Sequence, residues 1–230
     1  MGILLDIIPQ LVELDNKVML FLNQFHCPVF DGIMWTVSDK WVWVPFYVVL
    51  AFFLFRRDKW LKGIVCLLFI ALAITLSDQI CGSALRHAVG RLRPSNPENP
   101  ISQFIHIVNG YRGGRYGFPS CHAANTFALA TFLILYFRTR LAAFVLLPWA
   151  MLVGYSRIYL GVHYPGDILC GMCMGGLLGS SVFWLHAQTY VLAAKVSLWR
   201  KERKAAPLYR TFGNSFTFAR RLIGLEDSVG

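Results

Sequence analysis

The feature that most constrains this chain is a series of long apolar runs that contain few charged residues. Five of them are evident, at residues 41–55, from residue 63 into the 80s, and at 119–137, 141–160 and 167–194. A bilayer offers no water to the backbone, so such segments cross it as helices that satisfy their own hydrogen bonds. Because 56% of the 230 residues are hydrophobic and 15% are charged, the sequence predicts an all-α, polytopic membrane bundle of five to six helices.

The two ends of the chain differ from these runs. Polar residues interrupt the first segment where a spanning helix should be most hydrophobic, namely Pro9, Glu13, Asp15, Asn16 and Lys17. We interpret residues 1–40 as an amphipathic segment in the membrane interface, with a sixth span as the alternative. Residues 41–194 then form the transmembrane domain, and residues 195–230 form a basic cytoplasmic tail that rests on the membrane or is disordered.

The last apolar run carries a row of small residues. Gly171, Gly175 and Gly179 recur at every fourth position and therefore share one face of a helix. Such a row lets two transmembrane helices approach closely. Cys170 and Cys173 in the same run form a CxxC, but no second ligand pair follows, so we interpret them as small helix residues rather than zinc ligands.

Basic residues are distributed unequally between the two sides of the predicted bundle. The turn after the first run and the tail mix Lys with Arg, and the turn after the third run has Arg138 and Arg140, which places all three in the cytoplasm. Apart from Lys40, the opposite side uses only arginines: Arg86, Arg91, Arg93, Arg112, Arg115 and Arg157. Guanidinium is a planar, bidentate donor to phosphate, so they indicate an oxyanion site, with plain surface arginines as the alternative. The net charge of +10 thus favours phosphorylated lipids over nucleic acid as partners.

Three clusters on the arginine-rich side have fixed spacings. They are Arg86-x6-Arg93-Pro94, Pro119-Ser120-Cys121-His122 and Ser156-Arg157-x5-His163-x3-Asp167. The pattern resembles the signature of the type-2 phosphatidic acid phosphatase superfamily of membrane lipid phosphatases, which is Lys-x6-Arg-Pro, Pro-Ser-Gly-His and Ser-Arg-x5-His-x3-Asp. Two positions depart from it, because Arg86 replaces Lys and Cys121 replaces Gly. Arg86 keeps the charge, and the Gly position need supply only a backbone N–H.

The resemblance implies a role for each residue, and general chemistry supports these roles. His163 would attack phosphorus, while Asp167, expected at the N-cap of the last helix, would accept the proton of the other ring nitrogen. His122 would protonate the leaving alkoxide and then activate water. The groups around the phosphoryl oxygens would be Arg86, Arg93, Ser120, Arg157 and the amide of Cys121. Because arginines supply the positive charge, we expect neither a metal nor another cofactor.

Individual residues also admit other interpretations. A cysteine-dependent phosphatase would need Cys-x5-Arg, and the sixth residue after Cys121 is Phe127, which excludes that class. His163 as an interfacial histidine and Ser120 as a simple helix cap are the structural alternatives. Arg112 and Arg115 lie outside the signature, and we expect them to contact the substrate headgroup.

The predicted function is metal-independent hydrolysis of a lipid phosphate through a phosphohistidine, at the periplasmic face of a bacterial inner membrane. The segment after His122 and the additional arginine loop look most similar to lipid A phosphatases, so the expected substrate is the 4'-phosphate of lipid A. Undecaprenyl diphosphate, phosphatidylglycerophosphate and phosphatidic acid are the alternatives. From other classes, a binder or transporter of phosphorylated lipids would need the arginines but no nucleophile, and a structural protein would act through its basic tail. The sequence identifies no protein partner.

Overall fold

The structure is a computed structural model that describes the backbone of residues 2–222 and the side chains of residues 7–200. Within this range the regular secondary structure is helical, apart from an isolated β-bridge between Leu92 and Tyr116. The chain divides into two compact units, residues 1–184 and 185–230. The first unit contains the helix bundle and the site described below, and the second is helical as far as residue 222.

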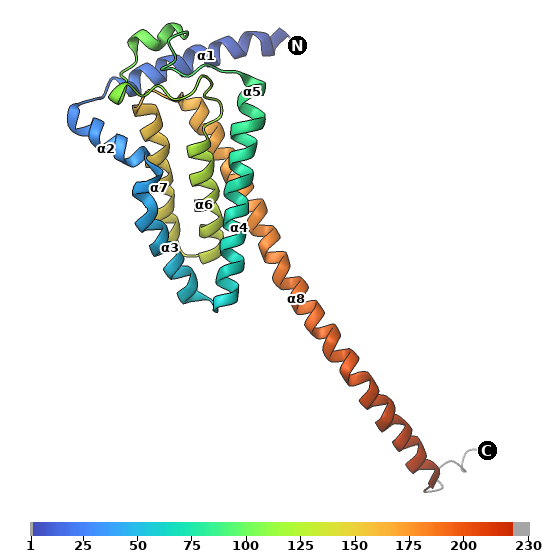
Figure 1. The fold of residues 1–230 in the computed structure, drawn as a ribbon. Coiled ribbons are helices and arrows are strands. Elements are labelled where there is room, and N and C mark those ends of the chain that lie inside the picture. Colours follow the sequence, from blue (N-terminus) through green and yellow to red (C-terminus); the bar gives the residue numbers. More distant parts are fainter. Residues whose placement is uncertain (1, 223–230) are drawn as a thin grey trace. The chain divides into compact units, whose positions relative to one another are not determined.

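The predicted all-α fold is confirmed. In chain order the helices are α1 (Gly2–Asn23), α2 (Pro28–Ser38), α3 (Val44–Arg57), α4 (Trp60–Asp78), α5 (Arg86–Val89), α6 (Cys121–Phe137), α7 (Arg140–Tyr159) and α8 (Pro165–Leu222). A short 3-10 helix at Lys40–Trp43 precedes α3, and a π-helical segment at Gln79–Leu85 joins α4 to α5. Helix α6 lies at the centre of the bundle, packed against α4 and α7 (Figure 1), and most of its side chains are buried.

The five predicted spans coincide with α3, α4, α6, α7 and α8, but the helices differ in length. By length and composition, Trp60–Val89, α7 and Pro165–Arg200 can each cross a membrane, whereas α6 is a shorter apolar helix. The run at α3 reaches sufficient length only together with α2, from which it is bent by 67°. The bend falls at Asp39, whose extended backbone ends α2 and whose carboxylate accepts a hydrogen bond from Trp41 N at 3.1 Å. The proposed domain boundary at residue 40 lies in this bend and stays a prediction.

Helix α1 lies across the end of the bundle where the long loops gather (Figure 1). Asp15 fixes it there, because one carboxylate oxygen contacts Arg91 Nη2 at 2.7 Å and the other accepts from Gly166 N at 2.8 Å. At its other end, the Asn23 side chain hydrogen-bonds the backbone of His106 and Tyr159. One of the polar residues that interrupt this segment, Asp15, thus attaches α1 to the bundle. The position of α1 in the membrane interface stays a prediction.

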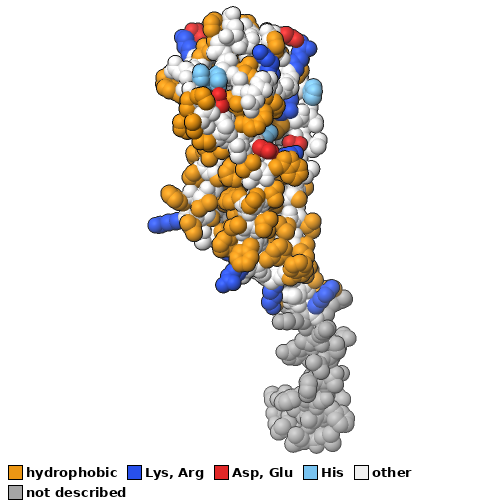
Figure 2. Space-filling view, turned by 60° about the vertical axis from the view of Figure 1, so that its left-hand side comes forward, with side chains coloured by type: hydrophobic (Ala, Val, Ile, Leu, Met, Phe, Trp, Pro, Cys, Tyr) orange, Lys and Arg blue, Asp and Glu red, His pale blue; other side chains and the backbone are white. Residues whose placement is uncertain are grey.

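A broad apolar belt covers the face of the first unit's bundle that Figure 2 shows. It contains large exposed side chains, among them Phe52, Phe53, Leu68, Phe144 and Leu177. Charged residues gather beyond the belt (Figure 2), as expected for a protein whose middle contacts lipid. The apolar belt and the spanning helices identify an integral membrane protein. Residues 223–230 of the predicted tail lie outside the described range, and the tail's contact with the membrane stays a prediction.

The row of glycines on α8 packs against α6, as predicted. A Cβ atom added at Gly171 would lie 2.6 Å from the carbonyl oxygen of Ser120, and one at Gly179 would lie 2.5 Å from that of Ala128. Gly175 faces Ala124 in the same way. Any side chain at these positions would therefore separate the two helices. This close contact matters for the site, because α6 and α8 each begin with residues of the signature.

Candidate active site

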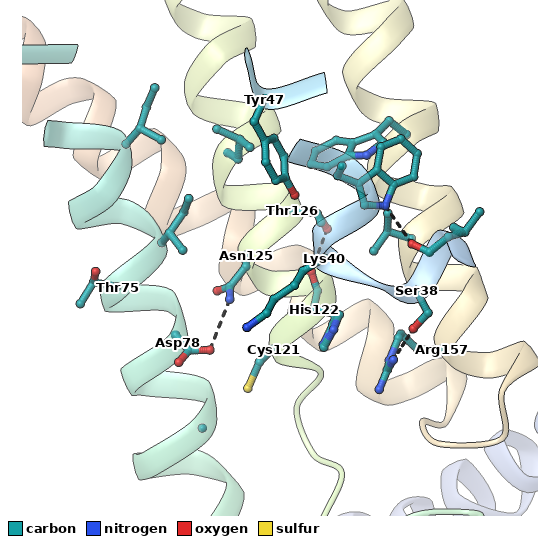
Figure 3. Close-up of a pocket in the computed structure, with 18 of the residues that line it drawn as sticks. Ser38, Lys40, Tyr47, Thr75, Asp78, Cys121, His122, Asn125, Thr126 and Arg157 are labelled. Carbon is teal, nitrogen blue, oxygen red and sulfur yellow. Dashed lines mark hydrogen bonds between the residues drawn. The ribbon is translucent and has the colours of Figure 1, made fainter. Parts of the chain in front are cut away.

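A cavity of about 850 Å³ lies among α3, α4, α6 and α7. Its deeper walls are apolar and include Leu50, Leu54, Ile70, Leu133 and Trp149. Its polar end is lined by Arg86, Arg93, Cys121, His122, Arg157 and His163. Figure 3 shows Cys121, His122 and Arg157 at this end, with Asp78 and Asn125 beside them. The structure therefore brings residues from all three sequence clusters to one end of one cavity.

His163 lies in the turn between α7 and α8 and is 1% exposed. Its Nε2 is 3.0 Å from Arg93 Nη1, and its Nδ1 is 3.4 Å from Asp167 Oδ2. Arginine can only donate, so the first contact requires an unprotonated Nε2 and leaves the ring proton on Nδ1, facing the carboxylate. Burial, together with the charges of Arg93 and Arg157, holds the pKa of His163 well below its ordinary value. The imidazole is therefore neutral, with its lone pair on Nε2.

Asp167 is completely buried and lies in the first turn of α8. Because α8 begins at Pro165, Asp167 is the third helical residue rather than the N-cap expected from the sequence. Its Oδ2 accepts a hydrogen bond from Tyr164 N at 3.0 Å, so the side chain reaches back to the residue before the helix. Its Oδ1 accepts from Arg91 Nη1 at 3.0 Å. Both oxygens are thus held in place beside His163.

Arg91 and Asp15 are residues whose part in the site the sequence did not reveal. Arg91 bridges Asp167 and Asp15, and its guanidinium lies 3.8 Å from the centre of the Tyr164 ring. Arg91 falls among the unspecified positions of the first cluster, and Asp15 lies about 150 positions away from Asp167 in the chain. The signal in the sequence was the presence of an acidic residue within an otherwise apolar segment.

The three arginines of the signature share one property. The Nε–H groups of Arg86, Arg93 and Arg157 are each buried and have no hydrogen-bond partner in the described part of the chain. Burial, together with the charges of Arg157 and Arg86, lowers the pKa of Arg93 to about 10. Repulsion between neighbouring positive charges and buried donors without acceptors are both unfavourable. An oxyanion bound between the arginines would neutralise the charge and accept hydrogen bonds from the donors. The arrangement therefore suits a phosphoryl group.

The remaining bonds of these arginines fix their positions. Arg93 Nη1 donates to the carbonyl of Val162 at 3.0 Å, and Arg157 Nη1 donates to Ser38 Oγ. Close packing leaves no room for side chains beside Arg93, because a Cβ at Gly113 would lie 3.2 Å from its guanidinium. Gly113 also has φ +67, a left-handed conformation that favours glycine. Arg86 Nη2 contacts Cys121 Sγ at 2.7 Å.

The start of α6 carries the second cluster. Ser120 is the N-cap, its Oγ accepts from Ala123 N at 3.5 Å, and its own N–H donates to the Asp167 carbonyl at 3.1 Å. The hydroxyl thus caps the helix, and a contact between Ser120 and phosphate stays a prediction. Cys121 and His122 are the first two helical residues, and both line the cavity. His122 lies near enough to His163 and Arg157 to interact electrostatically with both.

Arg112 and Arg115 do not line the cavity. Arg112 Nη1 donates to the Ser95 carbonyl at 2.6 Å, and Arg115 Nη2 pairs with Glu98 at 2.8 Å in an exposed position. Their predicted contact with a substrate headgroup stays a prediction. Other polar residues that do line the cavity were not expected there, namely Ser38, Lys40, Tyr111 and Asn125. Within the described residues, no group of three or more His, Cys, Asp or Glu is placed to hold a metal ion.

Known proteins similar to this chain are lipid phosphatases. The lipid A 4'-phosphatase of Bacteroides thetaiotaomicron is 46% identical over 187 residues, which are 81% of this chain and 80% of that protein. The lipid A 4'-phosphatase of Porphyromonas gingivalis is 33% identical over 186 residues, 80% of this chain and 78% of that protein. A crystal structure of a PAP2-type phosphatidylglycerolphosphate phosphatase from Bacillus subtilis has the same fold, with a TM-score of 0.56 at 23% identity over 78% of this chain and 87% of that chain.

A family model supplies the last comparison. The model of the PAP2 superfamily matches residues 65–190, a segment that contains all three clusters of the signature. It is the family that the spacing of those clusters resembles. The chain belongs to the PAP2 superfamily.

Proposed function

We propose that this phosphoric ester hydrolase removes the 4'-phosphate of lipid A, through a phosphohistidine at His163. One observation carries the reaction type: the neutral His163 ring lies between Arg93 and Asp167, beside three guanidinium groups with unpaired Nε–H donors. A nucleophile, its orienting carboxylate and an oxyanion seat are what phosphoryl transfer requires. The choice of lipid A is supported by the names of the two relatives described above.

In the first step His163 Nε2 attacks phosphorus, and the bond between phosphorus and the ester oxygen of the lipid breaks. Arg86, Arg93 and Arg157 stabilise the charge on the phosphoryl oxygens, and the Asp167 carboxylate, 3.4 Å from Nδ1, stabilises the ring as it becomes positively charged. His122 gives a proton to the leaving oxygen. The products of this step are the dephosphorylated lipid and phosphohistidine.

In the second step water opens the phosphohistidine. His122, now unprotonated, takes a proton from the attacking water, the P–N bond breaks and the electron pair returns to His163 Nε2. Inorganic phosphate leaves from the arginines. Because His122 is both proton donor and proton acceptor, it ends the cycle protonated and ready for the next substrate. The charge needed in both steps comes from the three arginines, so we propose that the reaction needs no metal.

The cavity accommodates a lipid whose phosphate lies at the polar end. Its apolar walls, such as Leu50, Leu54 and Ile70, continue from the arginines towards the middle of the bundle. A phosphate ester at the polar end can thus keep its hydrocarbon part in apolar surroundings. We propose an orientation in a bacterial inner membrane with the site in the periplasm. The Lys and Arg residues of the turn between α3 and α4, together with Arg138 and Arg140 between α6 and α7, support this orientation.

Phosphate release by the purified protein tests this function. The substrates are lipid A, undecaprenyl diphosphate, phosphatidylglycerophosphate and phosphatidic acid, each with EDTA present. We expect the highest kcat/KM with lipid A, no loss with EDTA, and no release by His163→Ala. His87→Ala, which changes an exposed histidine outside the cavity, serves as the control and should retain activity. A higher kcat/KM with undecaprenyl diphosphate would overturn lipid A as the proposed substrate. Binding of all four lipids without phosphate release would favour the alternative of a protein that binds or transports phosphorylated lipids.

A further inference from the structure

Beside the arginines, the cavity wall contains a polar pair that the reaction does not use. Asp78 lies in the last turn of α4, and Asn125 lies in the second turn of α6. Asn125 Nδ2 donates to Asp78 Oδ1 at 3.3 Å, and both residues line the cavity (Figure 3). Asp78 falls inside Trp60–Val89, which is apolar enough to cross a membrane, and an ionisable residue there is costly and calls for a function.

The pair stands next to the reacting groups. Asn125 follows His122 by three residues and Cys121 by four, so the three share one face of α6. One helical turn is about 5.4 Å, so the pair lies roughly one turn deeper than the phosphate seat. That is the place of the group to which the phosphate is esterified, between the arginines and the apolar walls.

The pair offers hydrogen-bond acceptors. Because Asn125 uses its amide N–H to bind Asp78, its Oδ1 points elsewhere, and that oxygen is buried without a hydrogen-bond partner in the described part of the chain. Asp78 is exposed and contributes a carboxylate oxygen that Asn125 does not use. A carboxylate and an amide oxygen side by side suit a ligand with two neighbouring O–H or N–H donors. An unpaired buried acceptor is unfavourable when the bound group cannot donate to it.

We propose that Asp78 and Asn125 form a subsite that binds the sugar bearing the phosphate, by accepting hydrogen bonds from its hydroxyl and amide N–H groups. The subsite rests on the proposed lipid A phosphatase function and explains how such an enzyme selects its lipid. A hexosamine phosphate carries hydroxyl or amide donors on the same sugar as the ester, whereas isoprenyl and diacylglycerol phosphates have no such donors there. Those lipids therefore leave both acceptors unpaired, and a site built to hydrogen-bond its substrate rejects such analogues strongly.

The test compares two lipids in the same protein. Initial rates are measured with lipid A and with phosphatidic acid for the wild type, Asn125→Leu and Asp78→Leu, whose apolar side chains keep the number and branching of the original heavy atoms. Thr75→Ala is the matched control, because Thr75 lines the same wall of α4 one turn before Asp78. Asp78→Asn, which keeps an acceptor oxygen, should rescue part of the selectivity lost in Asp78→Leu. Thermal unfolding in detergent verifies that each variant is folded.

We expect Asn125→Leu and Asp78→Leu to lower kcat/KM for lipid A by about 10- to 100-fold, mostly through KM, and to leave phosphatidic acid unchanged or improved. Thr75→Ala should keep the wild-type ratio of the two rates. Equal losses on both lipids, in folded variants of a wild type that prefers lipid A, would overturn the subsite alone and make the pair a structural contact. Unchanged rates on both lipids would also overturn it. A wild type that cleaves phosphatidic acid but not lipid A would instead overturn the proposed function.

Discussion

Two groups of arginines on the same side of the protein have different surroundings. Arg93 and Arg157 are 6% and 4% exposed, line the cavity and keep an unpaired Nε–H. Arg112 and Arg115 lie in the loop before α6. The guanidinium group of Arg112 donates to the backbone carbonyl of Ser95, and that of Arg115 pairs with Glu98. Both groups are arginines, and they differ in whether a hydrogen-bond donor is left unpaired beside the nucleophile His163. A count of arginines indicates phosphate, but only their partners indicate where it binds.

Among variants that test this difference, we expect the largest loss of activity for Arg93→Ala. Arg93→Ala removes the donor to His163 Nε2 and one of the cationic groups, so kcat should fall by about 1,000-fold or more. Arg112→Ala, which removes a guanidinium bound to the Ser95 carbonyl, should change kcat by only a few fold. Initial rates with lipid A measure both. Similar losses in the two variants would mean that the buried and loop arginines act alike.

A smaller effect is expected at Arg91, the partly buried link between Asp167 and α1. Arg91→Ala frees one oxygen of Asp167, so the carboxylate no longer holds the His163 ring in one orientation, and kcat should fall by about 10- to 100-fold. Asp15→Asn removes the other end of this link and should produce a weaker loss of the same kind. Unchanged kcat in both variants would show that Tyr164 N alone is sufficient to position Asp167.

The pH profile provides the third comparison. The neighbouring charges of Arg93 and Arg157 contribute to the lowered pKa of His163, so the wild type should keep its nucleophile unprotonated well into the acid range. Removing one charge in Arg157→Gln raises that pKa, and the acid limb of kcat/KM should move upward by about one pH unit. Arg115→Gln, in the exposed loop, should leave the limb in place. An unmoved limb in Arg157→Gln would assign it to another group.

The smallest effect on rate is expected at Cys121, which Arg86 contacts through its sulfur. Cys121→Gly keeps the backbone N–H and restores the residue typical of the family, so kcat should remain within about threefold of the wild type. A complete loss of activity would instead make the thiol part of the reaction. The same assay on Arg112→Ala and Arg115→Ala, with lipid A against phosphatidic acid, tests their predicted headgroup contact, which unchanged relative rates would eliminate.

The sequence predicted most of the fold because each bundle helix is an apolar run with polar ends. The spacing of the three clusters, which resembles that of one family, predicted that His163, Arg157 and Arg93 belong to a single site, and in the structure they line one cavity. The sequence does not show whether the chain divides at residue 40, because α2 and α3 reach the length of a membrane span only together, across the bend at Asp39. Hydropathy alone does not show that a helix shorter than a span continues beyond a bend.

Contacts between distant segments could not be predicted in the same way. Asp15 fits the polar face of an interfacial helix as well as it fits a partly buried ion pair, and only the docking of α1 beside Arg91 distinguishes the two. Similarly, the pattern of α4 shows that Asp78 is unusual but not that Asn125 faces it from α6. The exact start of a helix is also hard to predict from sequence. Whether Asp167 precedes α8 or lies within its first turn depends on the backbone conformation at Pro165.

The most direct test of the central claim is to trap the phosphoenzyme. The protein is mixed with lipid A carrying radioactive phosphate, quenched in alkali and separated from lipid, because phosphohistidine survives alkali and is destroyed by acid. The account predicts acid-labile label on the wild type and none on His163→Ala. Label that persists in His163→Ala, or label that withstands acid, would contradict a phosphohistidine at His163.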